Sequence, residues 1–123
     1  MPIRFDQHST VAMRALQIYL ILIGCAANER VITFAALANL MGYPGPTGLF
    51  TPLEHLAGWC RREGLPPITS LVVRDENGAP GPELAFPLEE VPARQHRARK
   101  FDWYAIMPPS ISDLEQTCLS TAA

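Results

Sequence analysis

The sequence has little excess charge of either sign. Its 123 residues include 10 lysines and arginines and 12 aspartates and glutamates, for a formal net charge of -2. A protein that neutralises many phosphates along a nucleic acid is strongly basic. The composition therefore excludes a basic coat for nucleic acid, and any contact with DNA or RNA must come from a local patch.

Cysteine is scarce as well. Cys25, Cys60 and Cys118 are widely spaced and form neither a C-x-x-C pair nor a Cys/His pair at zinc-finger spacing. Such spacing favours neither a disulfide framework nor a structural zinc site. We therefore expect three free thiols, no metal site and no cofactor.

No long hydrophobic run is present. The most apolar stretch, residues 15–27, is interrupted by Gln17 and is well short of the roughly 20 residues that span a bilayer. The first ten residues, MPIRFDQHST, lack the apolar core and small-residue cleavage site of a secretory signal. We expect a cytoplasmic protein with no membrane contact.

The groupings of residues that carry catalysis are missing too. Cys60 and His55 would point about 140° apart on a helix, so the helix alone cannot join them as nucleophile and base. The glycines at 42, 45 and 48 do not match G-x-G-x-x-G, and the three histidines are singletons. We predict a non-enzymatic protein with no catalytic residues; a site assembled by tertiary contacts is the remaining enzymatic alternative.

What is present is a packed globular composition. Hydrophobic residues make up 48% of the chain and charged residues 18%, and the length suits one domain. We predict one domain over residues 1–107. A peripheral C-terminal tail, 108–123, would follow it and has room for a short helix.

Two helices are predicted in the first third. Ser9 or Thr10 can cap a helix over 9–27, whose second half is apolar nearly all round. Thr33 can cap a short helix over 34–41, with Gly42 at the position that tolerates a positive φ. Because the second half of the first helix, residues 9–27, is apolar nearly all round, we expect several other elements to pack around it.

A third helix follows a stiff turn. Residues 43–52 hold three prolines and two glycines, which prevents a continuous helix there. Thr51-Pro52-Leu53-Glu54 has the pattern of a capping box with proline at the first helical position. We expect the helix to begin at Pro52 and to stop at Gly64.

A strand and a hairpin come next. Residues 68–74 are rich in β-branched side chains and precede Asn77-Gly78, a strong signal for a tight hairpin turn. The return arm, 79–90, contains prolines and can be an edge strand or an extended flap. The charged segment 89–100 then favours a solvent-facing helix, after which aromatic and aliphatic residues dock on the core: Phe101, Trp103, Tyr104 and Ile106.

This order of elements is that of a winged helix-turn-helix, an α+β fold with three helices, a β-hairpin and a C-terminal extension. The third helix would be the presenting helix. Arg61 and Arg62 at its end, and Arg74 beside the hairpin, could contact phosphates. The alternative is that the two charges at the helix end only complement the helix dipole.

A second basic group is the best candidate for contact with nucleic acid. It consists of Arg94, His96, Arg97, Arg99 and Lys100, followed by the aromatic residues Trp103 and Tyr104. Cations and stacking rings together are typical of single-strand binding. The alternative is a solvated helix face paired with the glutamates at 89 and 90, with the aromatic residues as core anchors.

The segment TFAALA at 33–38, followed by Met41-Gly42, a loop, a helix and a proline-rich strand start, resembles a known family. It is similar to the winged-helix half of alkylguanine-DNA alkyltransferases and alkyltransferase-like proteins, over roughly residues 31–80. The resemblance implies a DNA-binding winged helix. Pro66-Pro67-Ile68-Thr69 stands where that family has a Pro-Cys-His-Arg type motif, so alkyl transfer is not implied, and the family's DNA-opening arginine has no clear match.

A second resemblance concerns GLPPITSLVVRDENGAPG, with the later FDW, which is similar to uncharacterised small bacterial and mobile-element proteins. It implies a context of phage defence or anti-defence. Our first prediction is thus a module that docks DNA or RNA through the third helix, the hairpin and segment 94–100. The alternative is a protein-binding inhibitor or adaptor of mobile-element origin, for example of anti-CRISPR type.

Overall fold

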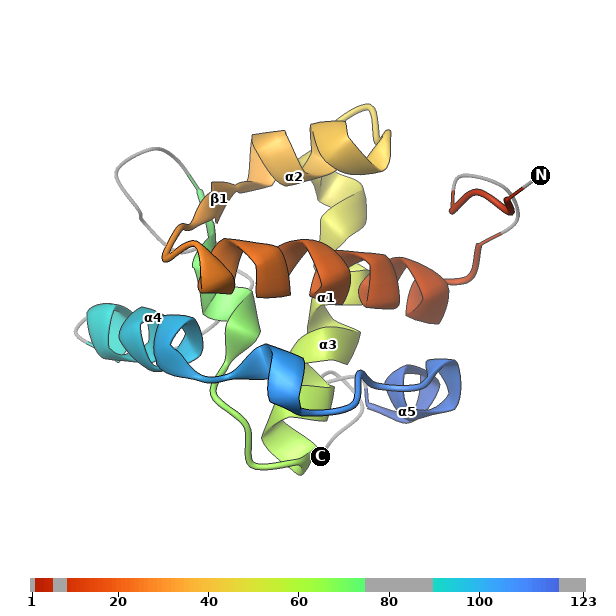
Figure 1. Cartoon of the computed structure of the whole chain (residues 1–123). Helices are drawn as coiled ribbons and strands as arrows, with labels where there is room; N and C mark the ends of the chain where they lie inside the picture. Colours follow the sequence, from red (N-terminus) through yellow and green to blue (C-terminus); the bar gives the residue numbers. More distant parts are fainter. Residues whose placement is uncertain (1, 6–8, 75–89, 118–123) are drawn as a thin grey trace.

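The computed structural model describes residues 2–5, 9–74 and 90–117 (Figure 1). The described chain is an α+β arrangement in which helices dominate. Its helices are α1 (Val11–Ala27), α2 (Phe34–Met41), α3 (Phe50–Arg62), α4 (Val91–Lys100) and α5 (Ile111–Gln116). Its strands are β1 (Ile32–Thr33) and β2 (Val72–Val73), and shorter 3₁₀ helices cover Pro46–Leu49, Ile68–Leu71 and Trp103–Ala105.

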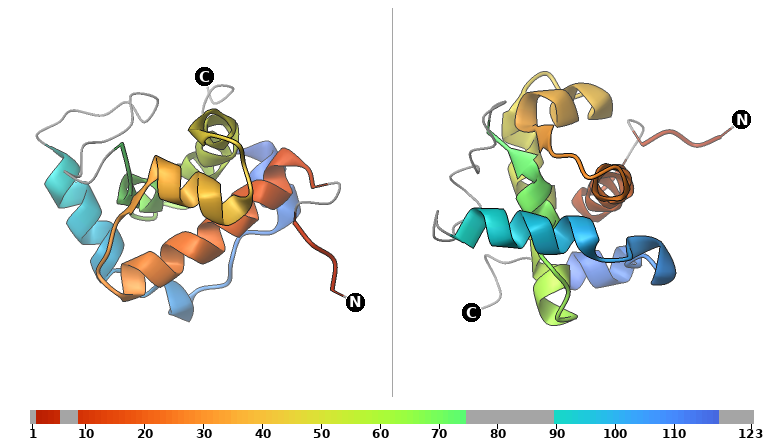
Figure 2. Two further views of the ribbon diagram at one scale, coloured as in Figure 1. Left: turned by 90° about the horizontal axis from the view of Figure 1, so that it is seen from above. Right: turned by 60° about the vertical axis from the view of Figure 1, so that its left-hand side comes forward.

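Helix α1 packs against α3, α4 and α5, and the core forms along this contact. Tyr19 of α1 is buried with its ring edge-on to Trp59 and Trp103, at centroid distances of 5.6 and 6.2 Å. In the right-hand view of Figure 2, where α1 is seen nearly end-on, it lies at the edge of the molecule. One side of α1 therefore builds the core. Leu20, in its second half, is 48% exposed, so other elements do not enclose this helix as the sequence predicted.

Local capping signals set the bounds of α1 and α2, as predicted. The hydroxyl of Thr10 accepts a hydrogen bond from the backbone of Met13 at 3.2 Å, and that of Thr33 accepts one from Ala36 at 3.1 Å. Gly42 ends α2 with φ of 77°, in the left-handed region where glycine has no steric penalty.

The start of α3 differs from the prediction. Leu49 precedes the helix in a helical backbone conformation, and no side chain caps it, so the capping box at Thr51 is wrong. The reason is the 3₁₀ helix Pro46–Leu49, which runs directly into α3 and lets the amide of Phe50 donate to the carbonyl of Thr47. Since the chain is already coiled when α3 begins, Thr51 and Pro52 fall inside its first turn.

The predicted strand over 68–74 is correct only at Val72–Val73. Residues 68–71 form a 3₁₀ helix in which the amide of Ser70 donates to the carbonyl of Pro67 at 3.0 Å. All four are at most 3% exposed, so tertiary packing overrides their β propensity. β2 pairs in parallel with β1, Ile32 opposite Val72 and Thr33 opposite Val73. Asn77-Gly78 and residues 79–89 of the predicted arm lie outside the described residues.

Helix α4 is where the charged segment predicts it, and the chain after it docks on the core. Val91 and Ala98 are buried, and the side-chain amide of Gln95 donates to the carbonyl of Ser70 at 3.1 Å. Of the residues expected to dock, Trp103 is buried, whereas Tyr104 is 67% exposed and does not dock.

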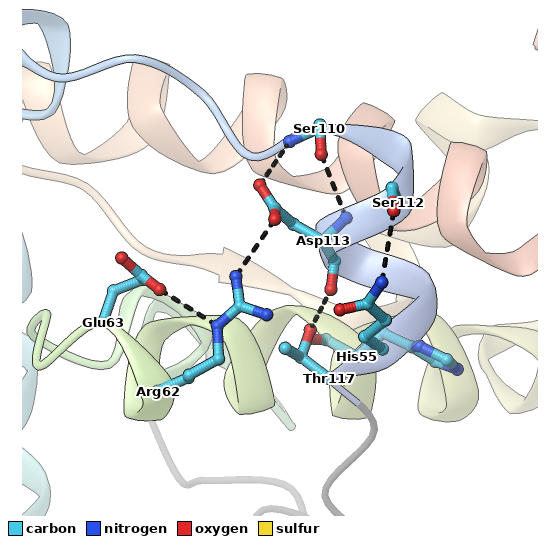
Figure 3. A network of polar contacts seen from close by, with 8 residues as sticks. His55, Arg62, Glu63, Ser110, Ser112, Asp113 and Thr117 are labelled. Carbon is cyan, nitrogen blue, oxygen red and sulfur yellow. Dashed lines mark hydrogen bonds and ion pairs between the residues drawn. The ribbon is translucent and has the colours of Figure 1, made fainter.

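The segment after Pro108 is not peripheral, which corrects the prediction. Ser110 and Asp113 form a capping box at the start of α5, and Leu114 is fully buried. The Thr117 hydroxyl donates to the carbonyls of His55 and Asp113, at 3.0 and 2.9 Å (Figure 3). α5 is therefore part of the core and is anchored to α3.

Candidate nucleic-acid interface

Helix α4 carries the densest group of basic side chains in the described chain. We call this group, together with the end of α1 beside it, the α4 basic surface; it comprises Arg94, His96, Arg97, Arg99, Lys100, Glu29 and Arg30. Val91 and Ala98 turn one side of α4 into the core, which leaves His96, Arg97 and Lys100 exposed to solvent. Because one side of α4 is apolar and buried, its cationic side chains point away from the core.

Two carboxylates partly neutralise this surface. Glu90 pairs with Arg94 at 3.0 Å, and Glu29 pairs with Lys100. The hydrogen bond from Lys100 is the main cause of the lowered pKa of Glu29, and the charges of Arg99 and His96 lower that pKa further. Glu29 therefore lies within the positive field of α4.

The local balance of charge is positive. Four cationic side chains of α4 (94, 97, 99 and 100) oppose the carboxylates of Glu29 and Glu90, which leaves +2. Exposed Arg30 and exposed Asp102, two residues past the end of α4, cancel one another, so the sum stays at +2. Arg97 and Arg99 form no ion pair with any described residue. This positive surface contrasts with a chain whose formal net charge is -2.

The sequence pattern did not reveal the contribution of α1. Glu29 is 71 residues from Lys100 along the chain. It reaches α4 because α1 ends in a left-handed turn, with φ of 54° at Glu29 and a hydrogen bond from the Arg30 amide to the Cys25 carbonyl. No local signal predicts that contact.

Arg61 and Arg62 lie at the end of α3, apart from the α4 basic surface. Arg62 pairs with Glu63 at 3.0 Å and with Asp113 of α5 at 3.1 Å (Figure 3). Hydrogen bonds from Arg62 to these carboxylates raise the pKa of its guanidinium. Arg62 thus holds α5 in place, whereas Arg61 is exposed and forms no ion pair in the described part of the chain.

Arg74 is exposed directly after β2, where the second described range stops. In Figure 1, α3 runs from α2 to the opposite end of the molecule, whereas β2 lies beside β1 near α2. The structure therefore separates Arg74 from the Arg61-Arg62 pair, and the candidate cations do not form one continuous surface.

Helix α3 offers little surface for presentation. Six of its residues are buried: Pro52, Leu53, Leu56, Gly58, Trp59 and Cys60. It packs against both α1 and α5, so its middle is a core element. That α3 presents a face to a ligand stays a prediction; its exposed residues, Thr51, Arg61 and Arg62, lie toward its two ends.

Trp103 is placed in the core instead of on the basic surface. It is 2% exposed, and its indole N–H donates to the carbonyl of Ala98 at 2.7 Å. The ring is therefore not available to stack on a base in this conformation. This geometry matches the core-anchor interpretation of the sequence.

The residues with catalytic potential are separated and engaged. Cys60 is 1% exposed, and burial raises the pKa of its thiol to about 12. His55 contacts the carbonyl of Leu114 through Nδ1. Within residues 2–5, 9–74 and 90–117, no cluster of three histidine, cysteine or acidic side chains could hold a metal ion.

Two surface hollows flank the first half of α1, away from α4. Their volumes are about 340 and 460 Å³, and both are lined by Phe5 and Arg14. The Arg14 guanidinium donates to Gln17 at 2.7 Å and lies 4.5 Å from the centre of the Tyr43 ring. Arg14 is thus occupied by its own neighbours.

Comparison with known protein families, curated proteins and solved structures finds no match for this chain. Among the helices that the structure describes, none has both the length and the apolar character needed to cross a bilayer.

Proposed function

We propose that this chain is a non-enzymatic module of winged-helix type that binds nucleic acid through the α4 basic surface. The observation that carries the proposal is the local sum of +2 at the end of α4 and α1, with Arg97 and Arg99 not paired within the described chain. The order helix, strand, helix, helix and strand from α1 to β2 supports the winged-helix assignment.

The charge pattern sets the mode of binding. A few exposed arginines and one lysine contact phosphates without reading sequence, because phosphate oxygens are the same at every step. With about three phosphate contacts, the logarithm of affinity should fall with the logarithm of salt at a slope of about -3 on a duplex. The acidic remainder of the chain would then orient the α4 basic surface toward the nucleic acid.

A protein-binding inhibitor or adaptor, of the kind that acts in phage defence or anti-defence, is the second candidate. It is favoured by the net charge of -2 and by Glu90 and Glu29, which already engage Arg94 and Lys100. In that case the basic end of α4 would complement the helix dipole and an acidic face of the partner.

The test is fluorescence anisotropy with labelled single-stranded DNA, duplex DNA and RNA over a range of salt. The double variant Arg97→Ala/Arg99→Ala should weaken binding about tenfold at low salt and make the salt slope shallower by about 2. The matched control is Arg61→Ala/Arg74→Ala, which removes the same charge elsewhere and should change affinity less.

Equal losses from both double variants would mean that only net charge matters, and the α4 basic surface would then not be the site. Binding to none of the three nucleic acids at low salt would reject the proposal. A stoichiometric, nuclease-resistant protein partner recovered from the native host would in that case establish the adaptor.

A further inference from the structure

Tyr104 is an exposed aromatic residue close to the end of the basic helix. It is 67% exposed and belongs to the 3₁₀ helix Trp103–Ala105, which only two residues separate from α4 and which contacts α1 (Figure 1). Four residues of chain keep its Cα atom within about 15 Å of that of Lys100. Tyr104 forms no hydrogen bond or ring contact with any residue that the structure describes. Its ring is therefore available to a ligand of the α4 basic surface.

The short helix that carries Tyr104 is fixed to the core. Trp103 is 2% exposed, and its indole N–H donates to the carbonyl of Ala98 in α4 at 2.7 Å. The amide of Ala105 donates to the carbonyl of Asp102 at 3.2 Å, which closes the turn. A 3₁₀ helix turns by about 120° per residue, so the burial of Trp103 leaves Tyr104 on the solvent side. Since this support is already ordered, a ligand that contacts Tyr104 would have little chain to order.

The charges beside Tyr104 differ on its two sides. Toward α4, Arg97 and Lys100 are exposed, and Arg97 and Arg99 form no ion pair with a described residue. Nearer to Tyr104, Asp102 is exposed and would repel a phosphate. This pattern fits a strand whose phosphates contact α4 and whose base, which is uncharged, lies at Tyr104.

We propose that Tyr104 stacks on an unpaired base, so that the α4 basic surface binds single-stranded nucleic acid more tightly than duplex. This inference rests on the proposed function and names its ligand class. A ring can stack only on a base whose face is free, and single strands can turn such bases outward, whereas in a duplex neighbouring bases cover the faces. Stacking accepts every base, so the preference is for strandedness and not for sequence.

Strand preference is informative because phosphate contacts alone act in the opposite direction. A duplex has the higher density of negative charge, and each contact to it releases more counterion than a contact to a single strand. A surface that offered cations alone would therefore bind duplex at least as tightly. Tighter binding to a single strand requires a contact with the bases.

The test is fluorescence anisotropy with a labelled oligothymidylate and with a mixed-sequence duplex of the same length. The wild-type chain should bind the single strand more tightly. Tyr104→Ala should weaken binding to the single strand about tenfold, the order expected for one stacked base, and should leave duplex binding unchanged. Because stacking releases no counterions, the salt slope should also stay unchanged in Tyr104→Ala, whereas Arg97→Ala/Arg99→Ala should make it shallower.

Three further variants separate stacking from general apolar contact. Tyr104→Phe keeps the ring and should bind as the wild type does, whereas Tyr104→Leu keeps apolar bulk without a planar ring and should bind as weakly as Tyr104→Ala. Leu40→Ala removes another exposed apolar side chain, 61% exposed on α2, and should leave affinity unchanged. Circular dichroism checks that all variants fold. Full affinity in Tyr104→Leu would overturn the stacking contact.

A strand without bases gives the matched control on the ligand. An abasic oligonucleotide of the same length keeps the phosphates and removes the stacking partner. The wild-type chain and Tyr104→Ala should bind it equally, and both more weakly than the wild type binds oligothymidylate. A Tyr104→Ala loss as large on the abasic strand would show that Tyr104 does not stack on a base.

The outcomes distinguish this inference from the proposed function. If Arg97→Ala/Arg99→Ala weakens binding but Tyr104→Ala does not, the α4 basic surface remains the site and stacking by Tyr104 is rejected. Tighter binding of the wild-type chain to duplex than to the single strand also rejects it. If the arginine variant loses no affinity, the proposed function fails, and this inference fails with it.

Discussion

The carbonyl oxygen of Thr117 lies 1.9 Å from the position that a β-carbon on Gly58 would occupy. This close approach joins the end of α5 to the middle of α3, and only glycine permits it. The Thr117 hydroxyl reinforces the contact through its hydrogen bond to the carbonyl of His55. A residue that the sequence pattern assigns to a helix interior is thus a docking point for the C-terminal segment.

Replacing Gly58 by alanine should therefore destabilise the fold. The added methyl group forces Thr117 away, at an expected cost of about 1 to 3 kcal/mol in the free energy of unfolding. Urea unfolding followed by circular dichroism measures this cost.

Gly24→Ala is the matched control, because no atom lies within 4 Å of its β-carbon position. It should stabilise α1 by up to about 1 kcal/mol through helix propensity alone. Opposite signs for the two variants are expected. A Gly58→Ala chain as stable as Gly24→Ala would show that α5 does not dock on α3.

Asp113 should make the attachment of α5 dependent on pH. The Ser110 amide, followed by the Arg62 side chain, lowers the pKa of its carboxyl in the folded chain. A lowered pKa favours folding while the carboxylate is charged, so this stabilisation is complete above the unfolded pKa of about 3.9. It is lost as the pH falls through the folded pKa.

Comparison of the wild-type chain with Asp113→Asn isolates this effect. The difference in unfolding free energy between them should be constant near neutral pH and should shrink as the pH falls below about 3.9. Glu115→Gln on the same helix serves as the charge control. A difference that persists unchanged in acid would mean that the Asp113 carboxylate does not stabilise α5.

The parts of the fold that the sequence predicted are those fixed within one turn of chain. Thr10, Thr33 and Gly42 bond to backbone only a few residues away, so their patterns are visible in the sequence. The predictions that failed concern segments whose structure depends on tertiary packing. Residues 68–71 are β-branched in part but coil because they are buried between α1, α3 and α4.

The candidate site likewise has residues that the sequence predicted and residues that only the tertiary fold brings together. The cationic residues of α4 lie close together in the sequence, so they can be recognised there. The structure places them on one helix. Glu29 and Arg30 lie beside these cations only because of the tertiary fold. Glu29 and Lys100 are 71 residues apart in the sequence. The burial of Trp103 could not be predicted either, because an aromatic residue after a basic run suits a core and a stacking site equally.

Trp103→Phe separates those two roles. The phenyl ring keeps most of the buried apolar surface but cannot donate to the carbonyl of Ala98, which is left without this bond at the end of α4. The expected loss of stability is about 1 to 3 kcal/mol, measured by thermal unfolding.

The same variant should leave nucleic-acid affinity unchanged at temperatures where it is folded. Tyr104→Ala, at an exposed position, should hardly alter stability. If Trp103→Phe instead keeps full stability but binds nucleic acid more weakly, Trp103 must leave the core and contact the nucleic acid.

Glu29 gives the sharpest test of the α4 basic surface, because one residue carries two separable properties. Its φ of 54° is a conformation that glycine adopts more readily than glutamate. Its carboxylate also neutralises Lys100 and lies in the field of Arg99 and His96. Glu29→Gly changes both properties, whereas Glu29→Gln removes only the charge.

Both variants should bind nucleic acid several-fold more tightly at low salt, since Lys100 becomes available to a phosphate. Only Glu29→Gly should also raise the urea midpoint, because only glycine relieves the left-handed backbone. Anisotropy and urea unfolding on the same preparations measure the two effects independently. If neither variant binds more tightly, nucleic acid does not contact the end of α4, whatever happens to stability.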